Sequence, residues 1–349
     1  MILIFCNKLI FNCILFYFSF VKILYSIQGT GNGHVSRARE IIPFLKKYGD
    51  LDILISGTQA EVALDDEVKY RFKGLGFIFG EKGGFDFWKT WKSFDSRQFI
   101  KDCRNLPVEK YDLVINDFEP ITAWSCKLKK VKSVSLSHQS AFYSKKTPQL
   151  KGFHWGKVIM KNYAPASSKV AFHFQKYDDF IQTPVIRSEI RNLKPENRGY
   201  YTVYLPAYSD EFILNLIKIF PETRWQIFSK HSSEYYEKYN AEIFPIDNEK
   251  FRKSLQNCCG FLTGGGFEGP AEALFLKKKL LSVPMYNQYE QLCNALALEE
   301  MGIPVVWKES QFPEKLGKWI VSENNIEINF PDETEKIIET IFKTQFPEM

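Results

Sequence analysis

The sequence has no disulfide framework, no N-glycosylation sequon and no marked excess of one charge. Its seven cysteines follow no regular spacing, and Cys258 and Cys259 lie in an apolar run that is typical of reduced core residues. No Asn-x-Ser/Thr triplet occurs, which is usual for cytosolic proteins. The 46 basic and 41 acidic residues give a net charge of +5, which suits an acidic ligand or an anionic membrane. We expect a cytoplasmic protein without a nucleic-acid partner.

Motifs for metal and nucleic-acid binding are missing too. The chain has no H-E-x-x-H, no paired C-x-x-C and no RNP-like sequence. The segment 50–52 (DLD) imitates a D-x-D metal motif, but it opens a predicted strand at the end away from the expected ligand edge. We therefore expect no metal.

The chain is long and apolar enough for two cores. It has 349 residues, of which 45% are hydrophobic, and this length favours two domains. Residues 1–20 form a separate apolar segment. We interpret them as a mis-called upstream extension before a true start at Val21, because a membrane span ending at Phe20 would leave no linker before the first predicted strand. A genuine membrane anchor is the alternative.

From Val21 onward, short β-branched or apolar runs alternate with helical stretches, which is typical of a parallel sheet with crossover helices. The pattern pauses in the charged segment 184–199 and restarts at 200–206 (YYTVYLP). We therefore predict an α/β protein with two doubly wound, Rossmann-like domains and a cleft between the carboxyl edges of their sheets. The predicted divisions are a first domain at 21–190, a second domain at 198–325 and a final helix, within 326–349, that returns to the first domain.

A glycine-rich loop, GTGNGH, follows the first predicted strand and opens a helix. Gly29, Gly31 and Gly33 allow backbone N–H groups to approach an anion at the helix N-terminus. The G-x-G-x-G spacing differs from the G-x-G-x-x-G of dinucleotide sites, which argues against such a site. His34 ends the loop, where a neutral imidazole can take a proton from a hydroxyl. A capping or packing histidine is the alternative.

A second predicted strand, glycine run and helix occur at 258–278. The glycines at 264–266 precede a helix that begins near Glu268. Glu268 and Glu272 share a helix face, but Glu268 would repel bound phosphates, so Glu272 is the better acceptor for ribose hydroxyls. The amide-rich segment that follows, 287–294, suits the hydroxyls of a sugar. Capping of a helix is the alternative role of these polar residues.

Together these two segments resemble the paired signatures of the GT-B glycosyltransferases of family 28. That family includes the bacterial enzyme that adds N-acetylglucosamine to a lipid-linked peptidoglycan precursor, and the plant monogalactosyldiacylglycerol synthase. GTGNGHVSRA resembles the family's N-terminal loop and histidine, and GGGFEGPAEALFLKKKLLSVP with Gln291 resembles its donor-binding region. The chain departs from the family by the additional Asn32 and by a shorter stretch between Pro284 and Gln291, which affects the expected donor sugar and acceptor more than the reaction.

The resemblance implies a nucleotide-sugar donor in the second domain and an acceptor beside His34 in the first. The implied donor-site residues are Gly264, Gly265, Gly266, Phe267, Glu268, Glu272, Asn287, Gln288, Gln291 and Asn294. The implied acceptor-site residues are Gly29, Gly31, Asn32, Gly33 and His138.

Polar residues also follow two other predicted strands of the first domain. Asp117 and Glu119 come after the strand at 112–116, and His138 and Gln139 come after the strand at 131–136. The carboxyl ends of parallel strands are the usual place for ligands. We predict His34 and Asp117 as catalytic residues, with Asp117 orienting the histidine. Ordinary loop polarity is the alternative.

We predict metal-independent transfer of a hexose-type sugar from a nucleotide-sugar, a UDP-sugar, to a hydroxyl of a glycan or lipid acceptor. Backbone N–H groups at the helix starts would stabilise the leaving diphosphate. A nucleotide-sugar epimerase of the same fold and a non-catalytic sugar-nucleotide-binding subunit are the alternatives. The segment 83–99, which mixes aromatic and basic residues, predicts peripheral membrane contact. A flap over the acceptor site and a core patch are its other interpretations.

Overall fold

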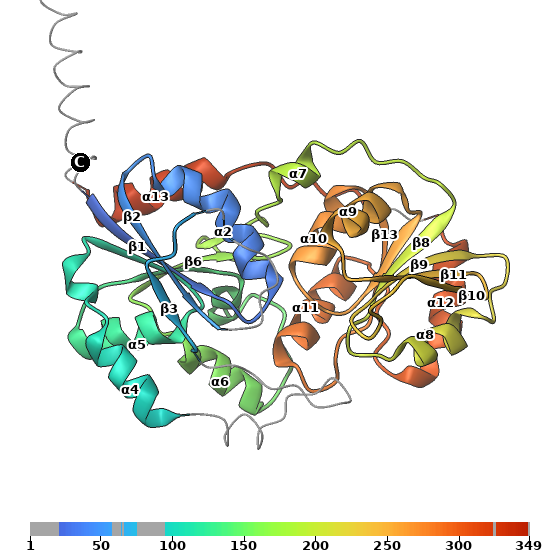
Figure 1. Ribbon diagram of the computed structural model, residues 1–349, viewed down its shortest axis with the longest axis horizontal. Helices are drawn as coiled ribbons and strands as arrows, with labels where there is room; N and C mark the ends of the chain where they lie inside the picture. Colours follow the sequence, from blue (N-terminus) through green and yellow to red (C-terminus); the bar gives the residue numbers. More distant parts are fainter. Residues whose placement is uncertain (1–20, 58–63, 65, 75–94, 324–325, 348–349) are drawn as a thin grey trace, which may run out of the picture.

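The computed structural model describes residues 21–57, 64, 66–74, 95–323 and 326–347. The chain forms two domains, each built on its own largely parallel sheet, that lie side by side (Figure 1). This arrangement confirms the predicted fold class of two doubly wound α/β domains. The apolar extension 1–20 and most of segment 83–99 lie outside the described residues.

The first sheet is parallel throughout, with the strand order β3-β2-β1-β4-β5-β6-β7. Its strands are β1 (Val21–Gln28), β2 (Gly49–Ser56), β3 (Tyr70–Phe72), β4 (Leu113–Asp117), β5 (Val134–Ser137), β6 (Ser168–Phe172) and β7 (Ile181–Gln182). Central β1 is buried at all but one position, because a parallel strand covered by helices on both faces needs a nearly continuous apolar run.

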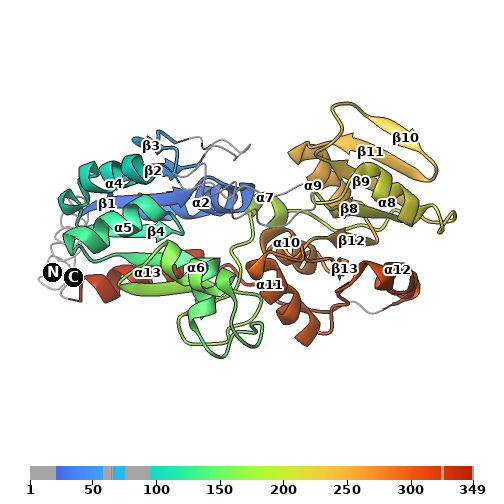
Figure 2. The same ribbon diagram turned by 90° about the horizontal axis from the view of Figure 1, so that it is seen from below.

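The helices of the first domain cover this sheet. They are α2 (Asn32–Leu45), α4 (Ser96–Asn105), α5 (Pro120–Lys129) and α6 (Trp155–Tyr163), with short 3₁₀ segments η1 (Val108–Lys110) and η2 (His138–Tyr143). Helix α2 buries Val35, Ala38 and Ile42 on one face against the sheet, as the spacing of its apolar residues dictates. Helix α6 buries only Met160 and Tyr163, and it lies where the two domains meet (Figure 2).

The second sheet has the order β10-β11-β9-β8-β12-β13, with only β10 antiparallel. Its strands are β8 (Tyr200–Tyr204), β9 (Arg224–Ser229), β10 (Tyr236–Lys238), β11 (Ala241–Pro245), β12 (Gly260–Thr263) and β13 (Lys279–Ser282). Its helices are α8 (Asp210–Ile217), α9 (Asn248–Asn257), α10 (Glu268–Phe275), α11 (Tyr289–Glu300) and α12 (Phe312–Val321), and η3 (Glu309–Gln311) precedes α12. The apolar run 303–306 resembles a further strand in the sequence, but it forms only an isolated bridge, between Val305 and Ser282.

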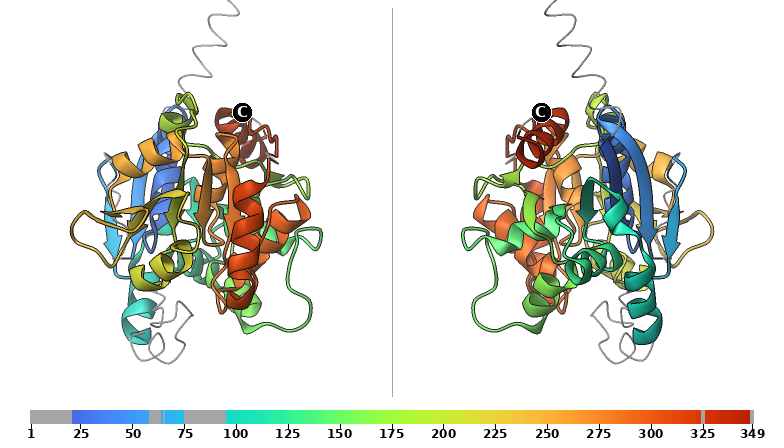
Figure 3. Two further views of the ribbon diagram at one scale, coloured as in Figure 1. Left: turned by 90° about the vertical axis from the view of Figure 1, so that its right-hand side faces the viewer. Right: turned by 90° about the vertical axis from the view of Figure 1, so that its left-hand side faces the viewer.

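The chain crosses between the domains twice. The first crossing contains the short helix α7 (Ser188–Arg191). The second leads to α13 (Thr334–Gln345), which packs on the first domain beside α2 (Figure 1) and is the dark red helix next to the C-terminus in Figure 3. There the rings of Tyr48 and Phe342 stack with centroids 4.1 Å apart. The Arg191 guanidinium donates to the carbonyl oxygen of Phe330 at 2.8 Å, so the two crossings are tied together. The domain limits drawn from the sequence remain predictions.

Two global properties complete the fold. Within the described part of the chain, no helix combines the length and the apolar character that crossing a bilayer requires. The five cysteines described there are free thiols, and all except Cys259 are buried.

Candidate active site

A cavity of about 850 Å³ lies between the two domains. Both glycine-rich loops border it, at the carboxyl ends of β1 and β12, where ligands of doubly wound sheets usually bind. Many of the residues singled out in the sequence line it. They are Gly31, Gly33, His34, His138, Gln139, Gly266, Phe267, Glu268, Asn287, Gln288 and Glu290.

The first glycine-rich loop joins β1 to α2. The N–H of Gly29 donates to the carbonyl oxygen of Ser56 at 2.6 Å, and a side chain at Gly29 would contact Ile55 at 2.9 Å. Gly29 therefore holds the loop against β2 and lies outside the cavity lining. Gly31 precedes α2 without a side-chain cap, and Asn32 is the first helical residue. The first backbone N–H groups of a helix lack intrahelical partners, so this end of α2 favours an anion.

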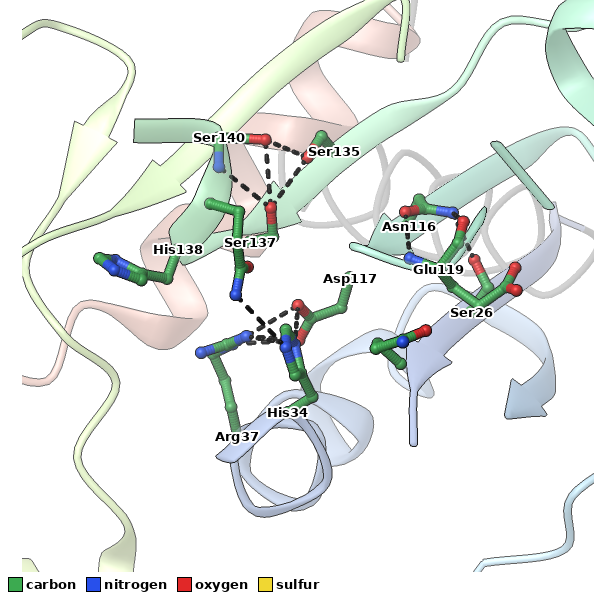
Figure 4. A network of polar contacts seen from close by, with 12 residues as sticks. Ser26, His34, Arg37, Asn116, Asp117, Glu119, Ser135, Ser137, His138 and Ser140 are labelled. Carbon is green, nitrogen blue, oxygen red and sulfur yellow. Dashed lines mark hydrogen bonds and ion pairs between the residues drawn. The ribbon is translucent and has the colours of Figure 1, made fainter. Parts of the chain in front are cut away.

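His34 and Asp117 form a hydrogen-bonded pair (Figure 4). His34 Nδ1 lies 2.8 Å from Asp117 Oδ1, and Asp117, the last residue of β4, is completely buried. Asp117 accepts, so it favours the tautomer with the proton on Nδ1 and leaves Nε2 of His34 as an acceptor. Gln139 Nε2 lies 3.4 Å from that Nε2. The pair therefore presents a basic nitrogen at the cavity.

Arg37 completes this group, and sequence reasoning missed it. It lies one turn after His34 on α2 and donates to both oxygens of Asp117, at 2.7 and 2.8 Å from one terminal nitrogen. Its other terminal nitrogen pairs with Glu268 of the second domain. Burial raises the pKa of Asp117, but the charges of Arg37 and His34 outweigh burial and lower the pKa below its usual range. In the sequence, the only indication of this role is that Arg37 lies three residues after His34, a spacing that places both side chains on one face of the helix.

The two residues after Asp117 shape the loop at the end of β4. Phe118 has a φ of 56°, a left-handed conformation that is uncommon for an aromatic residue and typical of functional loops. Its ring lies parallel to that of His34, with centroids 6.3 Å apart. Glu119 is buried and accepts from the N–H groups of Ile121 and Thr122 at 2.8 and 2.6 Å. Glu119 therefore caps α5 and does not face the cavity.

The second glycine-rich loop is braced from behind by side chains of α11. Gln291 Oε1 accepts from the N–H groups of Gly265 and Met285 at 3.2 and 3.1 Å. Asn294 Nδ2 donates to the carbonyl oxygen of Gly265 at 3.0 Å. Gln291 and Asn294 thus hold the second glycine-rich loop in shape. Neither of them lines the cavity, and Gly264 and Gly265 do not line it either.

His138 joins the domains. Its ring stacks on Phe267 with centroids 3.8 Å apart. Nδ1 donates to the carbonyl oxygen of Phe172 at 2.8 Å, and Nε2 lies 2.8 Å from Asn294 Oδ1. Burial lowers the pKa of His138, against the opposing charge of Glu290. His138 therefore borders the cavity and also contributes to the contact between the domains.

Glu272 is buried and paired with Arg187, which lies just before α7 in the first crossing. Arg187 donates to the two Glu272 oxygens at 2.5 and 2.8 Å. Burial raises the pKa of Glu272, and Arg187 opposes that rise. Each carboxylate oxygen has two acceptor positions, so one on each oxygen remains for another donor. Glu272 lies outside the cavity lining, and its role toward ribose stays a prediction.

Glu268 comes close to the first glycine-rich loop. A Cβ atom added at Gly33 would lie 2.6 Å from a Glu268 carboxylate oxygen. Glycine at position 33 therefore allows the first turn of α10 to approach α2, where Arg37 pairs with Glu268. This contact joins the start of the second domain's helix to the histidine pair of the first domain.

Two Rossmann-like domains that face each other across a cleft define the GT-B class, and solved structures share the arrangement. UGT89C1 of Arabidopsis thaliana, complexed with UDP, is 12% identical, with 93% of this chain and 94% of that chain covered and a TM-score of 0.57. MurG of Acinetobacter baumannii is 11% identical over 93% and 99%, with a TM-score of 0.53. The UDP-GlcNAc 2-epimerase of Methanocaldococcus jannaschii, complexed with UDP-GlcNAc and UDP, is 13% identical over 92% and 99%, with a TM-score of 0.57. At these identities the similarity establishes the fold.

The sequence profile described as glycosyl transferase family 1 matches residues 21–322, and the chain belongs to that family. No curated protein sequence matches the chain. The resemblance to GT-B glycosyltransferases that the sequence motifs indicated is therefore confirmed.

Proposed function

We propose that this glycosyltransferase moves a hexose-type sugar from a UDP-sugar to an acceptor hydroxyl and that it needs no metal. One observation carries the proposal: the starts of α2 and α10 border a single cavity, and His34 borders the same cavity with Asp117 behind it. An anionic leaving group and a nucleophile that must lose a proton need these two features side by side.

The second domain would hold the donor. Gly266 and the start of α10 face the cavity, where helix N–H groups favour a diphosphate. Asn287, Gln288 and Glu290 line the same wall and suit sugar hydroxyls. UDP in the UGT89C1 structure and UDP-GlcNAc in the epimerase structure support a donor of this kind. Glu272 would accept hydrogen bonds from the ribose hydroxyls at the acceptor positions that Arg187 does not occupy.

The first domain would hold the acceptor. The acceptor oxygen attacks the anomeric carbon, a new C–O bond forms, and the bond between that carbon and the diphosphate oxygen breaks. The hydroxyl proton passes to Nε2 of His34, and UDP carries away the electron pair of the broken bond. Asp117 stabilises the imidazolium that forms, while Arg37 holds Asp117 in place.

Release of UDP tests the proposal. Native protein incubated with a panel of UDP-sugars and soluble glycan or lipid acceptors should release UDP only when an acceptor is present. NMR of the same UDP-sugars without acceptor distinguishes the epimerase, which would convert the donor on its own. Donor binding without UDP release under any acceptor would instead identify a non-catalytic binding subunit.

The resemblance to family 28, the cytoplasmic location and the membrane contact through 83–99 belong to this proposal as well. The shared fold of MurG supports the first of them. Residues 83–94 lie outside the described part of the chain, so the contact through that segment stays a prediction.

A further inference from the structure

The start of α10 carries an acidic side chain at the place where the donor diphosphate would bind. Glu268 is the first residue of α10, and Phe267 before it provides no side-chain cap. The first N–H groups of a helix without such a cap favour any negative charge within reach. A carboxylate in the first turn is itself such a charge. Glu268 is therefore a competitor for the N–H groups that would hold the donor.

In the structure, Glu268 reaches across the cleft to the first domain instead. Among the described residues, its carboxylate hydrogen bonds to Arg37 of α2. It also lies so close to Gly33 that a Cβ atom there would be 2.6 Å from one carboxylate oxygen. The side chain of Glu268 is 29% exposed and borders the cavity, so it has room to move. Its contact with Arg37 leaves the start of α10 open for another anion.

Arg37 is anchored firmly enough to hold Glu268 in this position. One terminal nitrogen of Arg37 donates to both oxygens of Asp117, at 2.7 and 2.8 Å, and Nε donates to one of them at 3.1 Å (Figure 4). The other terminal nitrogen pairs with Glu268. Burial lowers the pKa of Arg37, but the charges of Asp117 and Glu268 outweigh burial and raise it. A fixed positive charge of the first domain therefore faces the start of α10.

Arg37 is the cation on which the position of Glu268 depends. Among the described residues that line the cavity, the carboxylates are Glu268 and Glu290, and none is a lysine or an arginine. Arg37 is part of the first domain and Glu268 is part of the second, so the two meet only while the domains are in contact. Separation of the domains would leave Glu268 without its cation and free to return to the start of its own helix.

We propose that Arg37 keeps the donor site open by holding Glu268 away from the start of α10, and that Glu268 displaces UDP from this start when the domains separate. Arg37 is a positioning residue in this role, because it acts through Glu268 and does not touch the donor. The acceptor domain thereby controls how tightly the donor domain holds UDP. The inference rests on the proposed function, in which the N–H groups of α10 bind the donor diphosphate.

A double-mutant cycle on UDP binding, measured by calorimetry, tests this dependence. Arg37→Gln should bind UDP about tenfold to a hundredfold more weakly than the native chain, the size of a hydrogen bond to a charged group. Glu268→Gln should bind UDP at least as tightly as the native chain, because the competing charge is gone. With Glu268→Gln already present, Arg37→Gln should change UDP affinity less than about threefold. Inorganic pyrophosphate, which lacks the nucleoside, should follow the same order.

Gly33→Ala provides a second route that leaves Arg37 and Asp117 in place. The added Cβ atom would push the Glu268 carboxylate off α2, so UDP binding should weaken in Gly33→Ala alone but not when Glu268→Gln is also present. The matched control is Glu290→Gln, which changes the other carboxylate of the cavity lining. In that background, Arg37→Gln should keep its full effect on UDP affinity.

Equal weakening by Arg37→Gln with and without Glu268→Gln would overturn the proposal, because Arg37 would then act on the fold or on UDP directly. Native UDP affinity in both Arg37→Gln and Gly33→Ala would overturn it too. Absence of UDP and pyrophosphate binding by the native chain would overturn both this proposal and the proposed function. If UDP binding follows the cycle but no acceptor causes UDP release, the sugar transfer fails and the role of Arg37 stands.

Discussion

At the scale of single residues, Arg37 links the two halves of the candidate active site. Its side chain is 2% exposed, and it divides its charge between Asp117 of the first domain and Glu268 of the second. Arg37 and His34 both contact Asp117, so Arg37 connects the histidine pair of the first domain to Glu268 of the second. The sequence could not reveal this arrangement, because Arg37 and Asp117 are 80 positions apart and Glu268 is far beyond both.

His34→Ala should lower turnover about 10²- to 10⁴-fold, as expected for loss of a general base, while the donor dissociation constant stays within about twofold. UDP-release kinetics and calorimetry of UDP binding measure the two effects. His231→Ala, which changes an exposed histidine of the second domain, serves as the control. Equal losses of turnover and donor affinity in His34→Ala would contradict a role in proton transfer.

Glu272→Gln should weaken UDP binding about tenfold to a hundredfold, because a hydrogen bond to a charged group contributes about 1.5–3 kcal/mol. The test is calorimetry with UDP and with 2′-deoxy-UDP, between which the variant should discriminate less than the native chain. Glu222→Gln, at an exposed turn, should behave as native. Unchanged affinity in Glu272→Gln would leave Glu272 with only its structural pairing to Arg187.

The lowered pKa of Asp117 gives stability a definite pH dependence. A carboxyl group whose pKa is lower in the folded state stabilises the fold above its ordinary pKa of about 3.9, and this stability is lost as pH falls through the folded value. The free energy of unfolding of Asp117→Asn should therefore decline less steeply in acid than that of the native chain. Denaturant titrations at several acidic pH values measure how the free energy of unfolding changes with pH. As a control, Asp50→Asn, at an exposed residue, should show the same change as the native chain.

At the scale of secondary-structure elements, the approach of α10 to α2 depends on the absence of a side chain at one position. Gly33→Ala would place Cβ against the Glu268 carboxylate, while Gly31→Ala would meet no atom within 4 Å. Gly33→Ala should therefore lower turnover at least about tenfold without lowering the melting temperature, since alanine favours a helix interior by about 1 kcal/mol. Native turnover in Gly33→Ala, or equal loss in Gly31→Ala, would count against a requirement for this contact.

The elements themselves were mostly predictable from the sequence. Central strands such as β1 and β12 are apolar over most of their length, and α2 has a clear apolar face, so their patterns are strong. Helix α6 has only a weak sequence pattern, because only two of its residues are buried. Strand β10 also has a weak pattern, because it is three residues long and lies at the sheet edge. Val305 belongs to an apolar run that is buried without forming a strand.

The candidate site was predictable in part for the same reason. Glycine-rich loops next to strong strands have a local signal, and they led to Gly31, Gly33, His34 and Gly266 at the cavity. Arg187 and Glu272 lie 85 positions apart, and no local pattern joins them. The bracing roles of Gln291 and Asn294 also depend on how α11 packs behind the second loop.

At the scale of the whole molecule, the chain passes from the first domain to the second and then back, and Arg191 ties the two passages together at Phe330. Both passages lie near α7, on the side away from α6 in Figure 1. Motion about these passages would therefore open the cleft at α6, where the cavity lining includes Trp155 and Met160. Movements of the two domains would change the cavity mouth more than its far side.

A protease site inserted at Pro195, in the exposed part of the first passage, tests this arrangement. After cutting, the two fragments should still elute together in gel filtration without denaturant, because α13 of the second fragment packs on the first domain. Ile338→Ala with Phe342→Ala, which removes buried side chains of α13, should let the cut fragments separate. Separation of the cut native protein would show that α13 adds little to the association.

The return of α13 also bears on how the protein can be made in the cell. The first domain leaves the ribosome before the second, yet the helix that covers Tyr48 follows the whole second domain in the chain. Until then, that part of the first domain is uncovered, and its aromatic surface is available to chaperones or to neighbouring copies. Folding of the first domain is therefore completed only after the second domain and α13 have been synthesised.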